Sequence, residues 1–238
     1  RSRNMLLEFS VENYLSFKNK VTFSMTATSI SEHQDTHVVE CGNFKILKSA
    51  VVYGANAGGK SNLLFAMNRM RSLIMNSSKE SQATEDLDVD AFKLNTANEN
   101  KPSMFEVVFI HQNILYRYGF VADKKRIFEE WLFNRPQLNK NKENVLFIRD
   151  HEKIEIKPKT VFSEEAKGLE IKTRKNALFI SVVANFNGKI ATSILEWMNE
   201  FEFLSGTDNS SIGYTARMLE NPEQKKNILG FIRAADFD

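Results

Sequence analysis

Hydrophobic and polar residues alternate strictly in two short segments near the start of the chain. Leu7, Phe9 and Val11 are separated by polar residues, and the same period of two returns over residues 21–25. Because successive side chains of a strand point to opposite faces, this period predicts two half-buried strands that pair antiparallel. The next segment, residues 26–42, is polar and has no period, and we expect a loop there.

A second pattern joins a short apolar run to an amphipathic helix. Residues 50–53 are Ala, Val, Val and Tyr, a composition typical of a buried strand in a parallel sheet. After a glycine-rich stretch, hydrophobic residues recur at helical spacing at Leu63, Met67, Met70 and Ile74. The order therefore predicts a strand, a glycine loop and a helix in direct succession.

The rest of the chain divides into a β-rich part and a helical part. Five short β patterns separated by turn residues predict an antiparallel β lobe; they cover residues 105–110, 115–121, 126–133, 145–149 and 154–156. Helical spacing then returns between Ile190 and Phe201, and Asn221-Pro222 begins a last helix. We expect N-terminal strands with the glycine-loop core, a polar linker or insertion, the β lobe and a helical segment, over residues 5–75, 76–103, 104–160 and 161–238.

Composition narrows the classes of protein that fit. The 238 residues are 42% hydrophobic and 26% charged, which is enough for a core and ordinary for a globular protein. No apolar run approaches the roughly 18 residues that span a bilayer, and no secretory signal is present, so we expect a cytoplasmic protein without a membrane partner. The single cysteine, Cys41, excludes an intramolecular disulfide. A net charge of +2 gives no electrostatic argument for a nucleic-acid partner. The sequence neither requires nor excludes DNA as a ligand.

Residues 54–61 carry the clearest chemistry of the sequence. They read Gly-Ala-Asn-Ala-Gly-Gly-Lys-Ser, which satisfies the pattern of glycine, four residues and Gly-Lys-Ser. We expect Gly54 and Gly59 to adopt backbone conformations closed to other residues, so that successive N–H groups surround an anion. Lys60 would reach the β- and γ-phosphates, and the Ser61 hydroxyl would coordinate Mg²⁺. A nucleoside triphosphate is the ligand that uses all of these groups.

Several motifs together resemble the opening of the AAA/ABC-type ATPases related to RecF, SMC and OLD proteins. The motifs are Asn13-Tyr14-Leu15-Ser16-Phe17, the stretch 52–64 around the glycine loop, Tyr116-Arg117-Tyr118-Gly119-Phe120, Glu130-Trp131-Leu132 and Asn176-Ala177-Leu178-Phe179-Ile180-Ser181. The closest likeness is to a bacterial group tied to phage defence and abortive infection. Members commonly have Ser at the position of Gly58, which the phosphate chemistry does not fix.

The resemblance implies a fold of the α/β (α+β) class, in which helices pack on a β-sheet. The implied fold is the N-terminal lobe of a P-loop NTPase with an ABC/SMC-like head. Such a lobe has a mixed sheet with the P-loop helix, an antiparallel β lobe and C-terminal helices. It implies ATP with Mg²⁺ as cofactors and a homodimer that closes around nucleotide to control a nuclease, a toxin or DNA. The expected nucleotide-binding residues are Gly54, Ala55, Asn56, Ala57, Gly58, Gly59, Lys60, Ser61 and Asn62.

Other parts of such an ATPase are harder to find in the chain. Asp150 follows an apolar run as a metal-organising acid would, but the alternation that resumes at Ile154 favours a hairpin turn. Residues 204–207 partly resemble the signature that closes on the γ-phosphate, and we interpret Ser205 and Gly206 as a helix end. The resemblance implies that the acidic pair, the signature and the switch histidine follow Asp238, so we expect the ATPase domain to continue beyond this chain and the chain alone to hydrolyse ATP poorly.

For the remaining candidate metal-binding or catalytic side chains, the sequence context favours a structural role. His33 and His37 are four residues apart, as metal ligands on a helix can be, but their segment has no apolar stripe and no third ligand. His111, Gln112 and His151 lie in turn-like segments between β patterns. Two other classes of protein stay open: a P-loop kinase of a small metabolite, and a non-catalytic interaction module that nucleotide stabilises.

Overall fold

The molecule comprises two compact units, residues Arg1–Phe201 and Glu202–Asp238. The second unit contains helices α7 (Ile212–Glu220) and α8 (Pro222–Ala234), the latter beginning at the predicted proline. Every other helix and strand belongs to the first unit. The computed structural model describes residues 4–79, 85–136, 138, 142–204 and 212–234.

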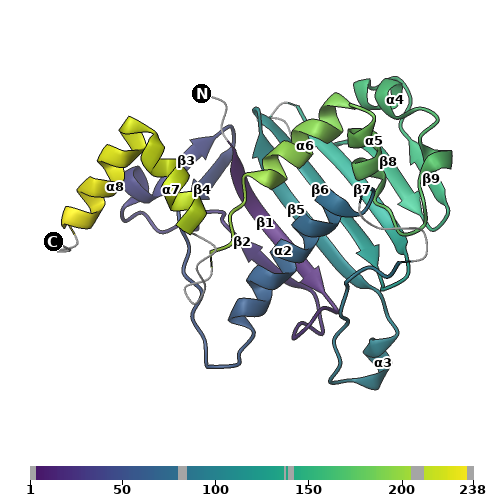
Figure 1. Ribbon diagram of the computed structural model, residues 1–238, viewed down its shortest axis with the longest axis horizontal. Coiled ribbons are helices and arrows are strands. Elements are labelled where there is room, and N and C mark those ends of the chain that lie inside the picture. The colour runs from purple at the N-terminus through teal and green to yellow at the C-terminus, as the bar shows by residue number, and fades with distance from the viewer. Residues whose placement is uncertain (1–3, 80–84, 137, 139–141, 205–211, 235–238) are drawn as a thin grey trace. The chain divides into compact units, whose positions relative to one another are not determined.

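A seven-stranded sheet forms the frame of the first unit (Figure 1). Its order is β2-β1-β5-β6-β7-β8-β9, and every neighbouring pair is antiparallel. The two N-terminal strands and the five β patterns of the middle segment are therefore confirmed, as one continuous sheet. The strands are β1 (Met5–Glu12), β2 (Val21–Ser24), β5 (Ser103–His111), β6 (Ile114–Ala122), β7 (Ile127–Arg135), β8 (Asn144–Asp150) and β9 (Lys153–Ile156).

The loop predicted over residues 26–42 is wrong in its second half. This part forms the short helix α1 (Gln34–His37) and strand β3 (Val38–Cys41), which pairs antiparallel with β4 (Phe44–Leu47). Each strand has four residues, too few for a clear period. They form because Cys41 and Ile46 bury their side chains with Leu7, Ile110 and Leu115 in a small second core.

Helices cover one face of the sheet (Figure 1). The longest, α2 (Lys60–Asn76), packs against α5 (Phe179–Asn185) and α6 (Lys189–Asn199), and α6 also contacts α4 (Val161–Ala166). A 3₁₀ turn (Glu170–Lys172) lies between α4 and α5, and the short α3 (Thr96–Glu99) precedes β5. None of the described helices is long and apolar enough to cross a membrane.

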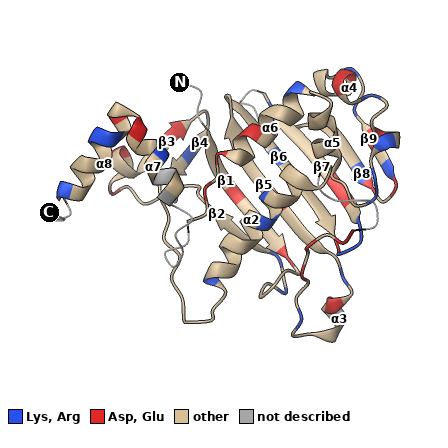
Figure 2. Cartoon of the chain, in the orientation of Figure 1, with Lys and Arg blue, Asp and Glu red and all other residues tan. Residues whose placement is uncertain are grey.

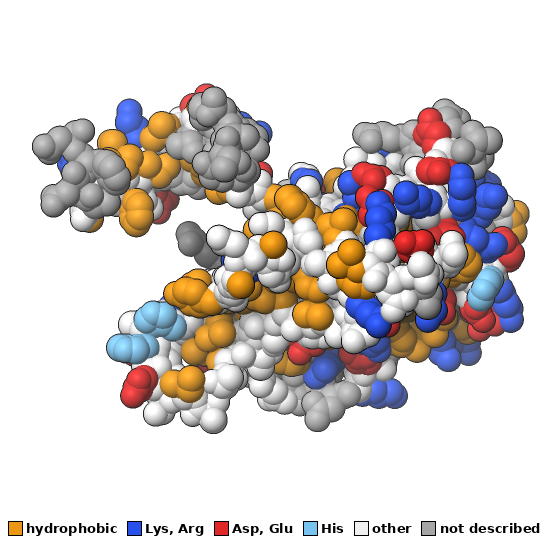
Figure 3. All heavy atoms as spheres, turned by 90° about the horizontal axis from the view of Figure 1, so that it is seen from below, with side chains coloured by type: hydrophobic (Ala, Val, Ile, Leu, Met, Phe, Trp, Pro, Cys, Tyr) orange, Lys and Arg blue, Asp and Glu red, His pale blue; other side chains and the backbone are white. Residues whose placement is uncertain are grey.

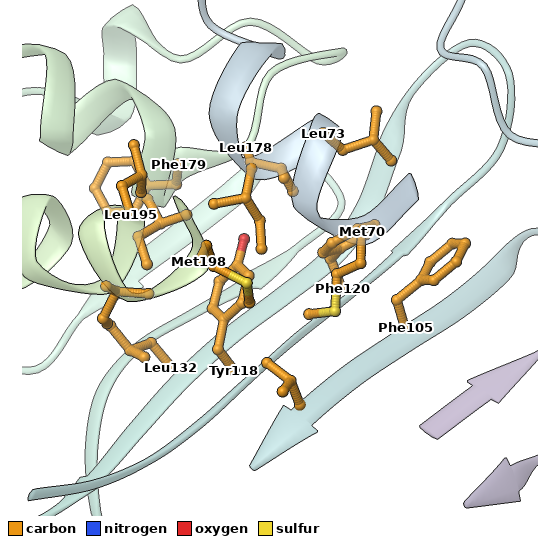
Figure 4. Close-up of a cluster of buried hydrophobic side chains, with 14 of the residues drawn as sticks. Met70, Leu73, Phe105, Tyr118, Phe120, Leu132, Leu178, Phe179, Leu195 and Met198 are labelled. Atoms are coloured by element: carbon orange, nitrogen blue, oxygen red, sulfur yellow. The ribbon is translucent and has the colours of Figure 1, made fainter. Parts of the chain in front are cut away.

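Three of the four residues of the predicted apolar stripe of α2 are buried, and the fourth, Met67, is partly buried against the core. Met70, Leu73 and Ile74 are buried with Leu63 and Ala66 on one helix face, at the spacing of three and four residues that defines such a face. Figure 4 shows Met70 and Leu73 above the aromatic side chains of β5 and β6, beside residues of α5 and α6. Full burial of such an aliphatic side chain contributes about 1.5–3 kcal/mol, so this face fixes the helix on the sheet.

A buried carboxylate connects the sheet to the start of α5. Glu130 on β7 accepts hydrogen bonds from the backbone N–H groups of Phe179 (2.7 Å) and Ile180 (3.0 Å) and from the Tyr118 hydroxyl (2.9 Å). The N–H groups of a first helical turn have no partner within the helix, and a negative charge there also interacts favourably with the helix dipole. Burial raises the pKa of Glu130, against the opposing effects of Arg149 and these donors.

The face of the sheet away from the helices carries Trp131 lying over Gly119. A Cβ at Gly119 would come within 2.6 Å of a ring carbon of this tryptophan, so only glycine fits beneath the ring. The indole N–H donates to Glu106 at 2.9 Å. Beside it, the Arg117 guanidinium lies 4.0 Å from the centre of the Phe133 ring. Glycine is therefore required at the fourth position of the Tyr116–Phe120 motif for steric reasons.

The predicted α/β class is confirmed, but the strand expected directly before the glycine loop is wrong. Residues 50–53 are not assigned to a strand, and Val51, Val52 and Tyr53 are 72%, 47% and 88% exposed. An apolar strand of a parallel sheet is stable only when neighbouring strands pair with it and both faces are covered. No described strand of this structure pairs with these residues, so the sheet has no parallel part.

Candidate P-loop nucleotide site

The glycine loop ends where the longest helix begins. Gly59 is the N-cap of α2 and has a left-handed backbone conformation with φ 84°. Before it, Ala57 also has a positive φ, 61°, and the Gly58 N–H donates to the Ala55 carbonyl at 3.1 Å. Residues 54–59 therefore form a turned loop at a helix N-terminus, where unpaired N–H groups and the helix dipole favour an anion.

The three glycines of the loop differ in what their backbone requires. Gly59 has the positive φ that was expected. The same expectation for Gly54 is wrong, because its φ is not positive and a Cβ there would make only ordinary contacts, 3.8 Å from the Lys60 side chain. Gly58, which the phosphate chemistry does not fix, is the more constrained position: a Cβ would lie 2.9 Å from the Ala55 carbonyl oxygen.

The Lys60 side chain folds back over the loop. Its ammonium donates hydrogen bonds to the carbonyl oxygens of Gly54 and Ala55, each at 2.7 Å. A full positive charge thus lies at the loop together with the helix N-terminus. Ser61 follows in the first turn of α2 with its side chain exposed, and Asn62 is half-buried beside it.

These groups fit the polyphosphate of a nucleotide. The ammonium of Lys60 is a point charge of the kind that holds phosphate oxygens, and the N–H groups of the first turn of α2 are donors without a partner inside the helix. The exposed Ser61 hydroxyl is an oxygen ligand of the type that Mg²⁺ accepts, usually together with phosphate oxygens and water. When bound, the metal would neutralise part of the phosphate charge; the donors and the ammonium come from the chain itself.

Ser16 is a neighbour of the loop that the sequence pattern did not predict. The Ser16 hydroxyl oxygen would lie 2.6 Å from a Cβ placed on Gly59, and it is the nearest heavy atom. Ser16 belongs to the turn between β1 and β2, 43 residues earlier in the chain. Its place inside the Asn13–Phe17 motif was the available signal, but the motif alone does not indicate which loop the turn contacts.

The structure separates the other candidate residues from the P-loop. Asp150 ends β8 and is paired across the hairpin with Lys153 of β9, as the alternation indicated, and it also contacts His151. Gln112 lies in the turn between β5 and β6 with φ 51°. Within the described part of the chain, no group of three or more His, Cys, Asp or Glu side chains could hold a metal ion. The signature-like residues Ser205, Gly206 and Thr207 lie outside the described residues.

Charge on the described surface does not define a nucleic-acid site. Figure 2 shows Lys and Arg interspersed with Asp and Glu over the helices and strands. Many of these side chains are paired, for example Arg117 with Glu143 and Lys124 with Asp90. The charge distribution on this surface, like the net charge of +2, therefore gives no argument for a nucleic-acid partner.

Hydrophobic side chains are exposed beside the P-loop. Val51, Val52 and Tyr53 precede it, and Leu64 and Phe65 follow on the first turns of α2. In Figure 3 hydrophobic side chains are exposed over the middle of the surface seen from below, whereas charged side chains gather toward the right. Clustered exposed hydrophobic side chains more often belong to a surface that contacts another polypeptide than to a surface that faces only water.

The loop, the helix that it caps, and the Lys-Ser pair define a P-loop nucleotide-binding domain. Residues 49–226 match the family model described as "AAA domain, putative AbiEii toxin, Type IV TA system", and the chain belongs to this family. Neither a curated protein nor a solved structure matches the chain. Family membership confirms the resemblance to AAA/ABC-type ATPases linked to abortive infection and indicates a nucleotide-binding ATPase domain.

Proposed function

We propose that this chain is the ATP-binding lobe of an ABC/SMC-like ATPase that uses ATP-driven dimer closure to control an effector. The effector would be a nuclease, a toxin or a DNA-linked machine in phage defence. The observation that carries the proposal is Lys60, whose ammonium lies on the carbonyls of a glycine loop at the N-terminus of α2. ATP with Mg²⁺ is the ligand that we assign, with residues 54–62 as its binding site.

Binding would redirect the Lys60 ammonium. Its two hydrogen bonds to the neutral carbonyls of Gly54 and Ala55 would be exchanged for bonds to the β- and γ-phosphates, which carry full charge. The loop N–H groups would donate hydrogen bonds to the phosphate oxygens at the positive end of the helix dipole. Ser61 would add its hydroxyl to the coordination sphere of Mg²⁺, which also keeps water and phosphate ligands.

Exposed apolar residues support closure of further polypeptide over this site. Val51, Val52 and Tyr53 precede the loop, and Leu64 and Phe65 lie on α2, all exposed to water. We propose that a second copy of the chain covers these residues when it approaches the bound nucleotide. Sedimentation of the protein with and without ATP·Mg²⁺ tests this step, and a protein that binds ATP but stays monomeric contradicts it.

Hydrolysis by this chain alone would be slow. An ATPase of this type needs an acid that organises Mg²⁺ and a glutamate that activates water. Asp150, the best local match in sequence, belongs instead to the β8–β9 hairpin. Release of inorganic phosphate at a low rate fits the proposal, transfer of phosphate to a metabolite would favour the kinase, and neither activity would favour a nucleotide-stabilised interaction module.

The test of nucleotide binding is a pair of lysine variants near the two ends of α2. Lys60→Ala removes the charge at the loop, whereas Lys79→Ala removes an exposed lysine just beyond the other end of α2. Hydrogen bonds to charged groups contribute about 1.5–3 kcal/mol, so Lys60→Ala should weaken ATP·Mg²⁺ binding roughly 10- to 150-fold. Calorimetric titration of ATP·Mg²⁺ into both variants and the wild type measures the effect. Equal affinities of Lys60→Ala and the wild type would refute the assignment.

A further inference from the structure

Ser16 occupies the space into which a side chain at Gly59 would point. The nearest heavy atoms to a Cβ built on Gly59 are the Ser16 hydroxyl oxygen, at 2.6 Å, and the Ser16 Cβ, at 3.5 Å. Gly59 itself has φ 84°, a conformation that glycine adopts readily but does not prefer over its right-handed counterpart. The backbone at the start of α2 is therefore in contact with a side chain from another part of the chain.

The turn that presents Ser16 is held in one conformation from within. Tyr14 and Phe17 exchange two backbone hydrogen bonds, at 3.0 and 2.8 Å, with Leu15 and Ser16 at the tip. Leu15 and Asn13 both have positive φ, 47° and 50°, although neither is a glycine. Asparagine adopts such angles readily, but leucine keeps them only where the surrounding structure imposes them, so Leu15 indicates that the tip is not free to move away from Gly59.

Contacts from outside the turn impose this conformation. The Asn13 side-chain amide donates to the carbonyls of Asn98, Lys101 and Pro102, at 3.0, 2.8 and 3.3 Å. The Ser103 hydroxyl donates to the Asn13 carbonyl at 2.5 Å. On the tip itself, the Leu15 N–H donates to the Asp90 carbonyl at 3.0 Å.

A second anchor joins the turn directly to α2. The buried Tyr14 ring packs edge-on against Phe105, with centroids 5.1 Å apart, and its hydroxyl is hydrogen-bonded to Arg69 of α2. Arg69 is in turn paired with Asp88. The tip and the first residue before the helix are therefore fixed to the same rigid element.

We propose that Ser16 is a positioning residue of the P-loop. Its side chain, held in place by the β1–β2 turn, supports Gly59 in the left-handed conformation from which α2 and the phosphate-binding N–H groups begin. The inference rests on the proposed nucleotide-binding function and deepens it. Loss of the side chain leaves Gly59 free to sample other conformations, and each ATP molecule that binds must then restore the loop.

The first experiment compares two exposed loop serines. Ser16→Gly should weaken ATP·Mg²⁺ binding about three- to tenfold, because ordering of the loop now opposes binding. Ser31→Gly introduces the same change in an exposed loop segment before α1 and should leave the affinity unchanged. Ser16→Thr keeps both Cβ and the hydroxyl oxygen and should restore affinity to within about twofold of the wild type. Equal affinities of Ser16→Gly and the wild type, or no restoration by threonine, would overturn the proposal.

The second experiment is independent of nucleotide. Gly59→Ala should lower the urea midpoint of unfolding, because the new Cβ meets Ser16, and adding Ser16→Gly should recover part of that loss. Strictly additive effects of the two substitutions would contradict the contact. A wild-type protein that binds no ATP would refute the proposed function alone, and the unfolding cycle would still decide whether Ser16 supports Gly59.

Discussion

Replacement of Glu130 should destabilise the first unit more than any surface substitution. The carboxylate is fully buried and accepts three hydrogen bonds, two from the first N–H groups of α5 and one from Tyr118. Glu130→Ala leaves these donors unpaired and leaves the buried Arg149 without its nearby negative charge. Breaking a buried charged network in this way costs about 3–5 kcal/mol.

Glu130→Gln separates the role of charge from that of shape. The amide has nearly the size of the carboxylate, but its NH₂ group would face a backbone N–H or the Tyr118 hydroxyl where an acceptor is needed. Loss of one charged hydrogen bond predicts a cost of about 1.5–3 kcal/mol. Glu129→Gln, the same change at the exposed neighbouring position, should stay within about 0.5 kcal/mol of the wild type.

Urea unfolding followed by circular dichroism measures these free energies. The expected order of destabilisation is Glu130→Ala, then Glu130→Gln, then Glu129→Gln. A Glu130→Gln variant as stable as Glu129→Gln would refute the account of the buried carboxylate, since the three hydrogen bonds would then contribute nothing net.

The same variants predict a pH dependence. Burial raises the pKa of Glu130 above its ordinary value of 4.5, so between pH 4.5 and the folded pKa the folded state binds more protons than the unfolded state. Stability from this group therefore falls as pH rises through that window and is constant below it. The difference in unfolding free energy between wild type and Glu130→Gln should shrink with rising pH above 4.5; a difference that grows would contradict the direction of the shift.

Three further substitutions test other parts of the fold. Gly119→Ala should cost roughly 1–3 kcal/mol, because its Cβ would overlap the Trp131 ring, and an unchanged urea midpoint would contradict the contact. Thr160→Ala removes the capping box that Thr160 forms with Ser163 at the start of α4 and should cost about 1 kcal/mol, whereas Thr160→Ser should not. Burial lowers the pKa of His111, so its stabilising contribution is complete above pH 6.5 and declines as pH falls toward the folded pKa; His111→Gln should remove that slope from the pH profile of unfolding.

Long periodic segments made much of this fold predictable from sequence. The stripe of α2 and the repeated alternation of the β lobe each bury one face, so the pattern and the packing have the same cause. The strands β3 and β4 were not predicted, because four residues are too few to show a clear alternation of hydrophobic and polar positions. The strand predicted over residues 50–53 was wrong for a different reason. These residues have the composition of an inner strand, but an inner strand also needs neighbouring strands that pair with it. Composition does not reveal whether such strands are present.

The contacts that matter most at the site join distant residues. The glycine pattern predicted the loop and the helix that follows it, but no local signal links Ser16 to Gly59. Likewise Glu130 has the sequence appearance of an exposed strand residue, and its partners are backbone groups 49 and 50 residues later. Backbone donors have no sequence signature, so such a carboxylate becomes recognisable only when the fold is known.

The placement of Trp131 over Gly119 gives the protein two optical reporters in different surroundings. The chain has two tryptophans, and the other, Trp197 of α6, is buried and stacks on Phe109 at 3.7 Å. One indole therefore senses the open side of the sheet, with Glu106 at its N–H, and the other senses the helix-covered side. With one of the two replaced by phenylalanine, emission from the remaining ring would follow the loosening of each layer of the molecule separately.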